Sequence, residues 1–481
     1  MLWGAGATAR LGFPTTNAQA DCLSKVAATE TGRLSERVRL AFPKANRQEQ
    51  RDIEDFLLIL GDIDARKNRP SQDEEVADAL RRQFGQLHAV DRRRHMEELR
   101  RIYDWPTLRR VILGSPRREL TSATASGVSP PKRAPISLQD LFNLLDLHIQ
   151  SNIGFHAPHP NDSGENAFIR PDSLPTARRA LQLLIILQFI LSHRHLLDHP
   201  NLLRPYKGFA DSLARLMQKE GLRFATENAE LAERSYYLFS YSLVSMNWDP
   251  FLLWLVFNAH NEANHDWSGV SVGHPSRPQK LFNDLAYMVA ARKVDDDDLD
   301  IWYMMGEGTA QRLNDSKHLG DRYVRTGKFY FPHGSFNLRE CPNCGKMNAY
   351  LGDEWNLRSR SLLPPLPFPT WSDKWRKARS DKEKASWSKG DMGLQCVYCG
   401  SMMGFEQISL LMQTSLKAIT SPYLEETQRE LRAALENAQH IVLMGYSLPK
   451  DDVFYRSVLA ARLRNPPERS NKKPLYVSLI G

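Results

Sequence analysis

Two Cys-x-x-Cys pairs carry the clearest chemistry in this chain. Cys341 and Cys344 form the first pair, Cys396 and Cys399 form the second, and together they use four of the five cysteines. Four thiolates are a complete tetrahedral ligand set for one structural zinc ion, and the glycine after each pair allows the tight turn that such a site needs. We therefore expect one zinc ion bound by these four residues. Chance pairing of buried cysteines is the alternative.

A histidine that could act as a base stands shortly before the first cysteine pair. His333 and Gly334 form a His-Gly dipeptide directly after the apolar run Phe329–Pro332. Histidine is the side chain most often used as a general base. A histidine at the end of a strand is also commonly a hydrogen-bonded structural residue. The dipeptide alone leaves both interpretations open.

The start of the chain has the form of a strand followed by a glycine-rich turn. The apolar residues Met1–Trp3 lead into a Gly-x-Gly turn and then into a second loop of small residues. Glycines let backbone N–H groups approach a phosphate, and the N-terminus of an adjoining helix adds a favourable field. An ordinary strand-to-helix turn is the alternative. The residues of these loops that we expect to bind a nucleotide are Gly4, Ala5, Gly6, Ala7, Thr8, Gly12, Phe13 and Pro14.

Two further segments have the pattern of strand ends. Asn247 and Asp249 follow one apolar stretch, and Gly445 and Ser447 follow the apolar run Ile441–Met444. Apolar runs bounded by glycine or by His-Gly are typical of buried parallel strands. Ligands of such sheets bind outside the carboxyl ends of the strands. The sequence therefore predicts that these segments, the first glycine loop and the His-Gly dipeptide meet at one cleft.

In this order the segments resemble the sirtuin family. The shared pattern is a Gly-Ala-Gly loop with a later Gly-x-Pro, an Asn-x-Asp strand end, a His-Gly before two cysteine pairs, and a late Gly-x-Ser-Leu. The resemblance covers the first twenty residues, roughly 236–255 and roughly 325–481. It implies an α/β fold in which a Rossmann-like open parallel sheet binds NAD, with a large helical insertion and a small zinc-ribbon lobe.

The chemistry implied by this resemblance is cleavage of the bond between nicotinamide and ribose in NAD. The reaction builds positive charge at the anomeric carbon, so the site needs hydrogen bonds to ribose hydroxyls and a base. By similarity to sirtuins, His333 is the base and Asn247 holds the nicotinamide ribose or a water molecule, while Asp249 could offset the developing charge. NAD is then a substrate, and zinc is a structural cofactor.

Departures from the deacylase pattern favour water as the acceptor. The Gly-x-Pro loop reaches Asn17 where sirtuin deacylases have an arginine, Ser245 and Met246 replace a Thr-Gln, and Pro449 to Asp452 follows the Gly-x-Ser-Leu. This last segment is similar to the sirtuin-like domains of prokaryotic antiphage defence proteins, which destroy NAD. We expect an NAD hydrolase. The alternatives are an NAD-dependent protein deacylase and a non-catalytic module that senses NAD or ADP-ribose or binds a partner.

The length of chain between the matching segments predicts a large insertion, which would cap the cleft or contact a second copy or a partner protein. We expect a discontinuous NAD-binding domain, a mostly helical insertion with an internal linker, and a zinc-ribbon lobe with an expanded loop. Their expected bounds are 1–20 with 236–481, 21–235 with the linker near 120–135, and 336–405 with the loop at 346–395.

Two apolar runs in the insertion have the composition of buried helices. They are Ile53–Leu60 and Ala180–Leu191. The second is too short for a membrane span and is flanked by Arg178, Arg179 and the His-Arg-His segment at 193–195, so no contact with a membrane is expected.

The charge of the chain is modest but unevenly placed. The formal net charge is +8, and arginines recur at Arg92–Arg94, Arg100–Arg101, Arg109–Arg110 and Arg117–Arg118. A solvated helix face is the default explanation of this cluster, and contact with nucleic acid is the alternative. Cysteines used for zinc, together with the lack of a signal peptide, predict a reducing cytoplasm.

Overall fold

The structure is a computed structural model of the 481-residue chain. The structure describes residues 1–28, 33–61, 71–85, 87–115, 136–158, 166–227, 241–266, 279–284, 290–292, 301–303, 323–350, 394–396, 398–403, 408–410, 421–449, 452–464 and 475–481. The expected linker near 120–135 and most of the expected loop at 346–395 lie outside these residues.

A six-stranded sheet forms the centre of the fold, and all its neighbouring strands are parallel. The prediction of an α/β fold with a parallel sheet is therefore confirmed. In spatial order the strands are β15 (Tyr476–Ile480), β14 (His440–Met444), β1 (Leu2–Trp3), β4 (Ser242–Ser245), β8 (Tyr323–Tyr330) and β5 (Gln279–Asp284).

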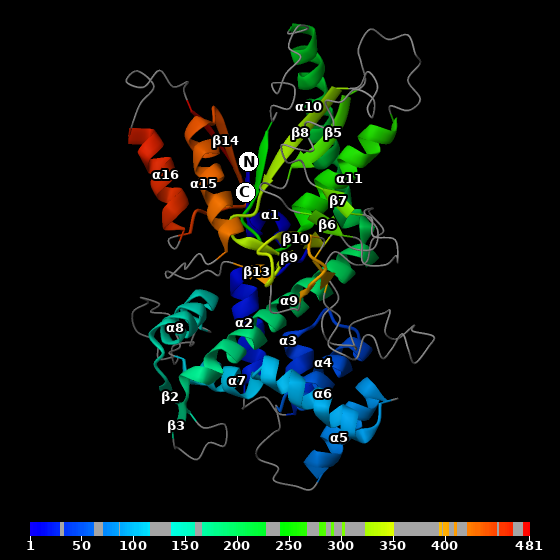
Figure 1. The fold of residues 1–481 in the computed structure, drawn as a ribbon, viewed down its shortest axis with the longest axis vertical. Helices are drawn as coiled ribbons and strands as arrows, with labels where there is room; N and C mark the ends of the chain where they lie inside the picture. Colours follow the sequence, from blue (N-terminus) through cyan, green and yellow to red (C-terminus); the bar gives the residue numbers. More distant parts are fainter. Residues whose placement is uncertain are drawn as a thin grey trace, which may run out of the picture.

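Successive side chains of the strands alternate between two hydrophobic cores, one on each face of the sheet. Trp3, Leu243 and Phe329 belong to the larger core, whereas their neighbours Leu2 and Val244 belong to the smaller one. The larger core includes residues of α11 (Phe251–Asp266) and α10 (Arg204–Glu227), and the smaller core includes residues of α15 (Pro422–Asn437) and α16 (Val453–Arg464). Figure 1 shows these two helix pairs on opposite sides of the sheet. The short helix α1 (Ala5–Ala9) follows β1 directly.

The residues between β1 and β4 are mainly helical, and in Figure 1 most of them form a layer below the sheet. Several helices begin where the sequence supplies a cap: the Thr15 hydroxyl accepts from the Ala18 amide, and Asn46 forms a capping box with Glu49. The helices are α2 (Thr16–Ala27), α3 (Leu34–Ala41), α4 (Arg47–Ile59), α5 (Ser71–Phe84), α6 (Ala89–Ile102), α7 (Trp105–Gly114), α8 (Leu138–Ser151), α9 (Leu174–Asp198) and α10, and a hairpin of β2 (Phe155–Pro158) and β3 (Asn166–Ile169) lies between α8 and α9.

Helix α9 is the long apolar helix expected from the sequence. With the preceding turn it spans Pro171–Asp198, and by length and composition it is the one candidate membrane span among the described residues. Its most apolar window is 67% buried inside the protein, which is typical of a core helix. Leu181, Leu187 and Leu196 of this helix have no exposed surface.

Two arginines of the basic cluster form hydrogen bonds within the helical layer itself. Arg109 donates from Nε to the carbonyl of Ala27 at 3.2 Å, and Arg100 donates from Nε to the carbonyl of Ile59 at 2.7 Å. These carbonyls belong to the last residues of α2 and α4, where helices have backbone acceptors without intrahelical partners. Part of the positive charge is therefore used for hydrogen bonds inside the protein, and contact of the cluster with nucleic acid stays the alternative to a solvated helix face.

A second sheet of five strands, which mixes parallel and antiparallel pairs, adjoins the carboxyl end of β8. Its order is β13 (Ile408–Leu410), β9 (Gly334–Glu340), β10 (Met347–Tyr350), β6 (Ala290–Arg292) and β7 (Ile301–Tyr303). A separate hairpin consists of β11 (Leu394–Gln395) and β12 (Met402–Met403). Each Cys-x-x-Cys pair lies in the turn of an antiparallel hairpin, the first between β9 and β10 and the second between β11 and β12.

Candidate functional site

The predicted site segments follow the carboxyl ends of neighbouring parallel strands, so they meet along one edge of the sheet. This placement follows from the register, in which Trp3 of β1 lies opposite Met444 of β14 on one side and Ser245 of β4 on the other. The segments beyond the four strand ends are Gly4–Thr8, Met246–Asp249, Phe331–His333 and Gly445–Ser447.

The glycines of the first loop allow it to touch the loop after β14. The Gly4 amide donates to the Met444 carbonyl and the Gly6 amide donates to the Gly445 carbonyl, each at 2.9 Å. A Cβ on Gly4 would lie 2.6 Å from the Gly445 carbonyl oxygen, and Gly445 has φ +57° with no room for a Cβ beside the Ala7 amide. The N–H groups of Gly4 and Gly6 are therefore used inside the protein, so a phosphate at this loop would bind to other groups.

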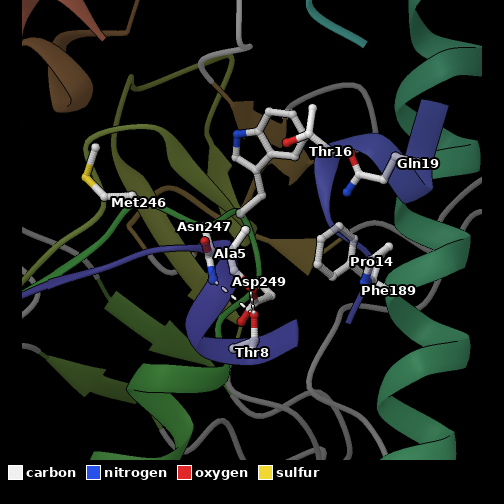
Figure 2. A pocket seen from close by; sticks show the side chains of 10 residues that line it. Ala5, Thr8, Pro14, Thr16, Gln19, Phe189, Met246, Asn247 and Asp249 are labelled. Atoms are coloured by element: carbon white, nitrogen blue, oxygen red, sulfur yellow. Dashed lines mark hydrogen bonds between the residues drawn. The ribbon is translucent and has the colours of Figure 1, made fainter. Parts of the chain in front are cut away.

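A cavity opens at this edge of the sheet, between the sheet and the helical layer (Figure 2). Its volume is about 30 Å³, and it opens to solvent. Five of its residues were expected from the sequence, and Thr16 and Gln19 of α2, Phe189 of α9, Met246 and Trp248 are additional. The expected residues that line it are Ala5, Thr8, Pro14, Asn247 and Asp249.

The polar wall of the cavity is formed by Asn247, Asp249 and Thr8 (Figure 2). The Asn247 amide nitrogen lies 3.4 Å from Thr8 Oγ1. Asp249 is 3% exposed, and its Oδ1 accepts from the Phe251 amide at 3.1 Å, which caps the start of α11. Its second oxygen, Oδ2, has no hydrogen-bond partner among the described residues.

Burial dominates the ionisation of Asp249. Desolvation raises the pKa of this carboxyl to about 6, although hydrogen bonds from the Phe251 amide and the Asn247 side chain partly oppose the shift. A carboxyl with this pKa exchanges its proton close to neutral pH. The cavity is therefore lined by a buried acid that has one oxygen without a hydrogen-bond partner among the described residues.

The apolar wall comes from the helical layer. The Phe189 ring lies 6.0 Å from that of Phe13 and 5.1 Å from that of Phe336, and the Trp248 ring is 6.0 Å from that of Phe336. Sequence reasoning missed Phe189, because α9 is apolar on every side and nothing in its pattern separates a cavity residue from a core residue. Phe13 is a buried support of this wall, and it is not among the residues that line the cavity.

His333 lies behind the cavity and is 3% exposed. Its Nδ1 is 3.2 Å from the carbonyl oxygen of Met246, a residue that lines the cavity. Its Nε2 is 3.2 Å from Oδ1 of Asp452, and the Tyr446 hydroxyl donates to the other oxygen of Asp452. The Nε2–Oδ1 separation suits a hydrogen bond but the ring angle does not, so the contact is electrostatic in this geometry.

Seven residues predicted to bind the nucleotide lie outside the lining of this cavity: Gly4, Gly6, Ala7, Gly12, Phe13, Gly445 and Ser447. Gly12 has φ +79° and its carbonyl accepts from the Lys44 side chain. Gly445 is occupied by its contact with the first loop, and Ser447 is exposed. The structure thus brings Asn247, Asp249 and Thr8 together, and it leaves Gly12, Gly445 and Ser447 out of the lining of the cavity.

The four cysteines form a compact cluster. Their sulfur atoms all lie within 4.8 Å of one another, with Cys341 Sγ 3.5 Å from Cys399 Sγ and Cys344 Sγ 3.6 Å from Cys396 Sγ. Four thiolates at about 2.3 Å from a tetrahedral zinc ion would lie about 3.8 Å apart. The cluster could therefore hold a metal ion such as zinc.

The hairpin turns shape this cluster. In the first turn the Gly345 amide donates to the Cys341 carbonyl at 2.9 Å, and in the second the Gly400 amide donates to the Cys396 carbonyl at 2.8 Å. Both glycines have positive φ, of 66° and 73°. The Asn348 amide points to Cys396 Sγ at 3.5 Å, as donors beside metal-bound thiolates do.

Comparisons with known proteins do not assign a family or a function to this chain. No protein-family model, no curated protein and no solved structure matches the chain. The protein has an α/β fold with a parallel sheet. It has a cavity at the carboxyl edge of that sheet, and a four-cysteine cluster that could hold zinc.

Proposed function

We propose that this chain is a sirtuin-like, NAD-consuming hydrolase that cleaves the bond between nicotinamide and ribose. The observation that carries the proposal is the pair of unlike walls in the cavity, with Asn247 and Asp249 on one side and Phe189 on the other. A flat heteroaromatic ring that bears a carboxamide has the complementary chemistry. If the chain is sirtuin-like, its parallel sheet is a Rossmann-like sheet. The four cysteines would hold a structural zinc ion.

The unpartnered oxygen of Asp249 supports an amide ligand. Leaving a buried polar group without a hydrogen bond costs about 1–3 kcal/mol. A carboxamide N–H would remove that cost by donating to Asp249 Oδ2. The ring itself would lie against Phe189 and Pro14, where aromatic and apolar contacts stabilise a planar group.

The reaction then follows from the charges that it creates. The bond from the anomeric carbon to nicotinamide breaks, both of its electrons go to the pyridine nitrogen, and positive charge develops at the carbon. Asp249 offsets that charge, and Asn247 orients the ribose or the attacking water. Water bonds to the carbon and gives a proton to His333, which yields ADP-ribose and free nicotinamide. The hydrolase proposal thus assigns a role to each predicted catalytic residue.

The test is nicotinamide release from NAD by the purified chain, measured by chromatography with and without an acylated lysine peptide. We expect release without peptide, and we expect His333→Ala and Asn247→Ala to slow it by about 100-fold or more. His440→Ala and Asn437→Ala are matched controls, because both residues are exposed and distant in sequence from the cavity residues.

The outcomes separate three functions. Release that requires the peptide would replace the hydrolase by a deacylase. Binding of nicotinamide or NAD without turnover under either condition would indicate a sensing or partner-binding module. Full activity of His333→Ala would remove this histidine from the mechanism.

A further inference from the structure

The side chain of Gln19 borders the cavity without a partner in the described part of the protein. It is 3% exposed and lies near the start of α2, and none of the described residues forms a hydrogen bond with its side-chain amide. Figure 2 shows this side chain reaching toward the cavity from the helical layer, on the side opposite Asn247 and Asp249. Buried side-chain amides normally have hydrogen-bond partners. Gln19 is therefore a polar group that a ligand in the cavity could pair.

Asp249 presents a second polar atom to the same small space. Its Oδ2 is buried and accepts no hydrogen bond from the described residues. The cavity that Asp249 and Gln19 both line has a volume of about 30 Å³, which is room for about two water molecules. Two polar groups that border so small a space can contact one and the same ligand group.

The two residues differ in the hydrogen bonds that they offer. An ionised carboxylate only accepts hydrogen bonds, whereas the side-chain amide of glutamine both donates and accepts. A ligand group that pairs with both must therefore donate on the side of Asp249, and it can accept on the side of Gln19. A carboxamide does this with two neighbouring atoms, its nitrogen and its carbonyl oxygen, in about the space of two water molecules.

We propose that Gln19 is a positioning residue for NAD, which donates a hydrogen bond from Nε2 to the carbonyl oxygen of the nicotinamide carboxamide while Asp249 accepts from the carboxamide nitrogen. This inference rests on the proposed NAD hydrolysis. A single contact with Asp249 would leave the pyridine ring free to pivot about one oxygen atom. A second contact stops that rotation, and it thereby fixes the direction of the bond from the pyridine nitrogen to ribose, which is the bond that breaks.

A purely structural role for Gln19, as a residue that fills space in α2, is the competing explanation. Gln19→Met keeps the length of the side chain and removes the amide, so the folded protein no longer buries an unpaired polar group. We expect this variant to be at least as stable as the wild type in urea unfolding. A loss of activity in Gln19→Met then cannot come from unfolding of the protein.

The kinetic experiment compares NAD with two analogues that differ from it only in the carboxamide. The 3-acetylpyridine analogue keeps the carbonyl oxygen and has a methyl group in place of the nitrogen, and the thionicotinamide analogue has sulfur in place of the oxygen. Each substrate is compared with itself in the wild type and in Gln19→Met. We expect kcat/KM to fall by about 10-fold for NAD and for the 3-acetylpyridine analogue. For the thionicotinamide analogue we expect a fall of about twofold or less, because sulfur is a weak acceptor.

Two further variants make the comparison selective. Gln19→Leu repeats it with a second apolar side chain. Gln218→Met is the matched control, because Gln218 is buried in α10, its Nε2 has no partner among the described residues, and it does not line the cavity. The control should keep the wild-type kcat/KM for all three substrates. Equal losses for all three substrates in Gln19→Met, or an unchanged kcat/KM for NAD, would overturn the proposal.

A titration with free nicotinamide tests the contact without any turnover. We expect Gln19→Met to raise the Kd for nicotinamide by about 10-fold and the Kd for thionicotinamide by about twofold or less. Equal affinities of wild type and variant for nicotinamide, or no binding to the wild type, would reject the contact. If the wild type binds nicotinamide but releases none from NAD, the hydrolase proposal fails while the titration still decides whether Gln19 holds the carboxamide.

Discussion

The side-chain amide of Asn247 lies 3.4 Å from the hydroxyl oxygen of Thr8, although the two residues are 239 positions apart in the chain. The contact joins the end of β4 to the first turn after β1 across the floor of the cavity (Figure 2). It orients the Asn247 amide before any ligand arrives. Such preorganisation lowers the cost of binding.

Thr8→Val should disturb this orientation while keeping the shape of the side chain. We expect kcat/KM for NAD cleavage to fall by about 3- to 10-fold, because one hydrogen bond between neutral groups contributes about 1 kcal/mol. Thr8→Ser, which retains the hydroxyl, should stay close to the wild type. Steady-state kinetics of the two variants provide the measurement, and equal losses in both would show that the methyl group matters and the hydroxyl does not.

Asp249 should reduce the stability of the fold at neutral pH. Its folded pKa of about 6 is raised from 3.8, so its contribution to stability is complete below pH 3.8 and is lost as pH rises through 6. We therefore expect Asp249→Asn to be more stable than the wild type by about 2–3 kcal/mol at pH 7.5 and by about half as much at pH 5. Urea unfolding at both pH values measures this difference. A variant less stable than the wild type at pH 7.5 would contradict it.

Two buried histidines should make the folded state less stable as pH falls, which is opposite to the effect of Asp249. Burial lowers the pKa of His193 and of His260 to about 3, so both are neutral in the folded protein. A lowered folded pKa means that their contribution to stability is present above the ordinary value of 6.5 and is lost as pH falls below it. We expect a loss of about 2 kcal/mol for each histidine between pH 7.5 and pH 5.

Substitution isolates this effect from that of Asp249. His193→Gln and His260→Gln should each weaken the loss of unfolding free energy on acidification, whereas His156→Gln, at an exposed position, should leave it unchanged. Chemical denaturation of the three variants at pH 7.5 and 5 makes the comparison. The same acid dependence in all of them would show that other groups control it.

Phe189→Ala should separate the role of α9 in the site from its role in the core. The truncation costs about 3–4 kcal/mol of stability, and removal of the apolar wall should raise KM for NAD by about 10-fold through lost aromatic contact. Phe84→Ala is the matched control, because Phe84 is also buried in the helical layer and is not among the cavity residues. Phe84→Ala should lower stability by a similar amount and leave KM unchanged. A rise in KM for both variants would show that the change in KM comes from the loss of stability.

Metal content should follow the four-cysteine cluster. We expect one zinc ion per chain by elemental analysis, lost in Cys341→Ser and retained in Cys22→Ala, since Cys22 is buried apart from the cluster and its burial raises the pKa of its thiol to about 12. Strand β9 joins Gly334, beside the proposed base, to Glu340, beside Cys341. Removal of the metal by a chelator should therefore lower NAD cleavage as well as stability. A fully active metal-free protein would show that the two ends of β9 are independent.

The parts of the fold that a short pattern determines could be predicted from the sequence. Apolar runs bounded by turns gave the parallel strands, and the spacing of Cys341 to Cys344 and Cys396 to Cys399 gave the sulfur cluster. Asn247 and Asp249 were expected at a strand end, and they do line one cavity.

The contacts that depend on tertiary packing could not be predicted. Phe189 has apolar neighbours on every side of α9, so only the packing of α9 against α2 and the sheet reveals which face borders the cavity. Asp452 meets His333 because two distant loops lie at the same sheet edge, and neither residue signals the other in the sequence. The glycines of the first turn looked like a phosphate site, yet close approach to Gly445 already requires them.

The close contact between the loops that contain Gly4 and Gly445 restricts which substitutions the protein can accept at these two positions. A Cβ at either position would meet backbone atoms of the other loop. Backbone atoms are common to every residue type, so no second substitution could make room for the first. A side chain at Gly4 or at Gly445 therefore cannot be accommodated by a compensating substitution in the other loop. Both glycines must be kept, or the backbones of the two loops must move together.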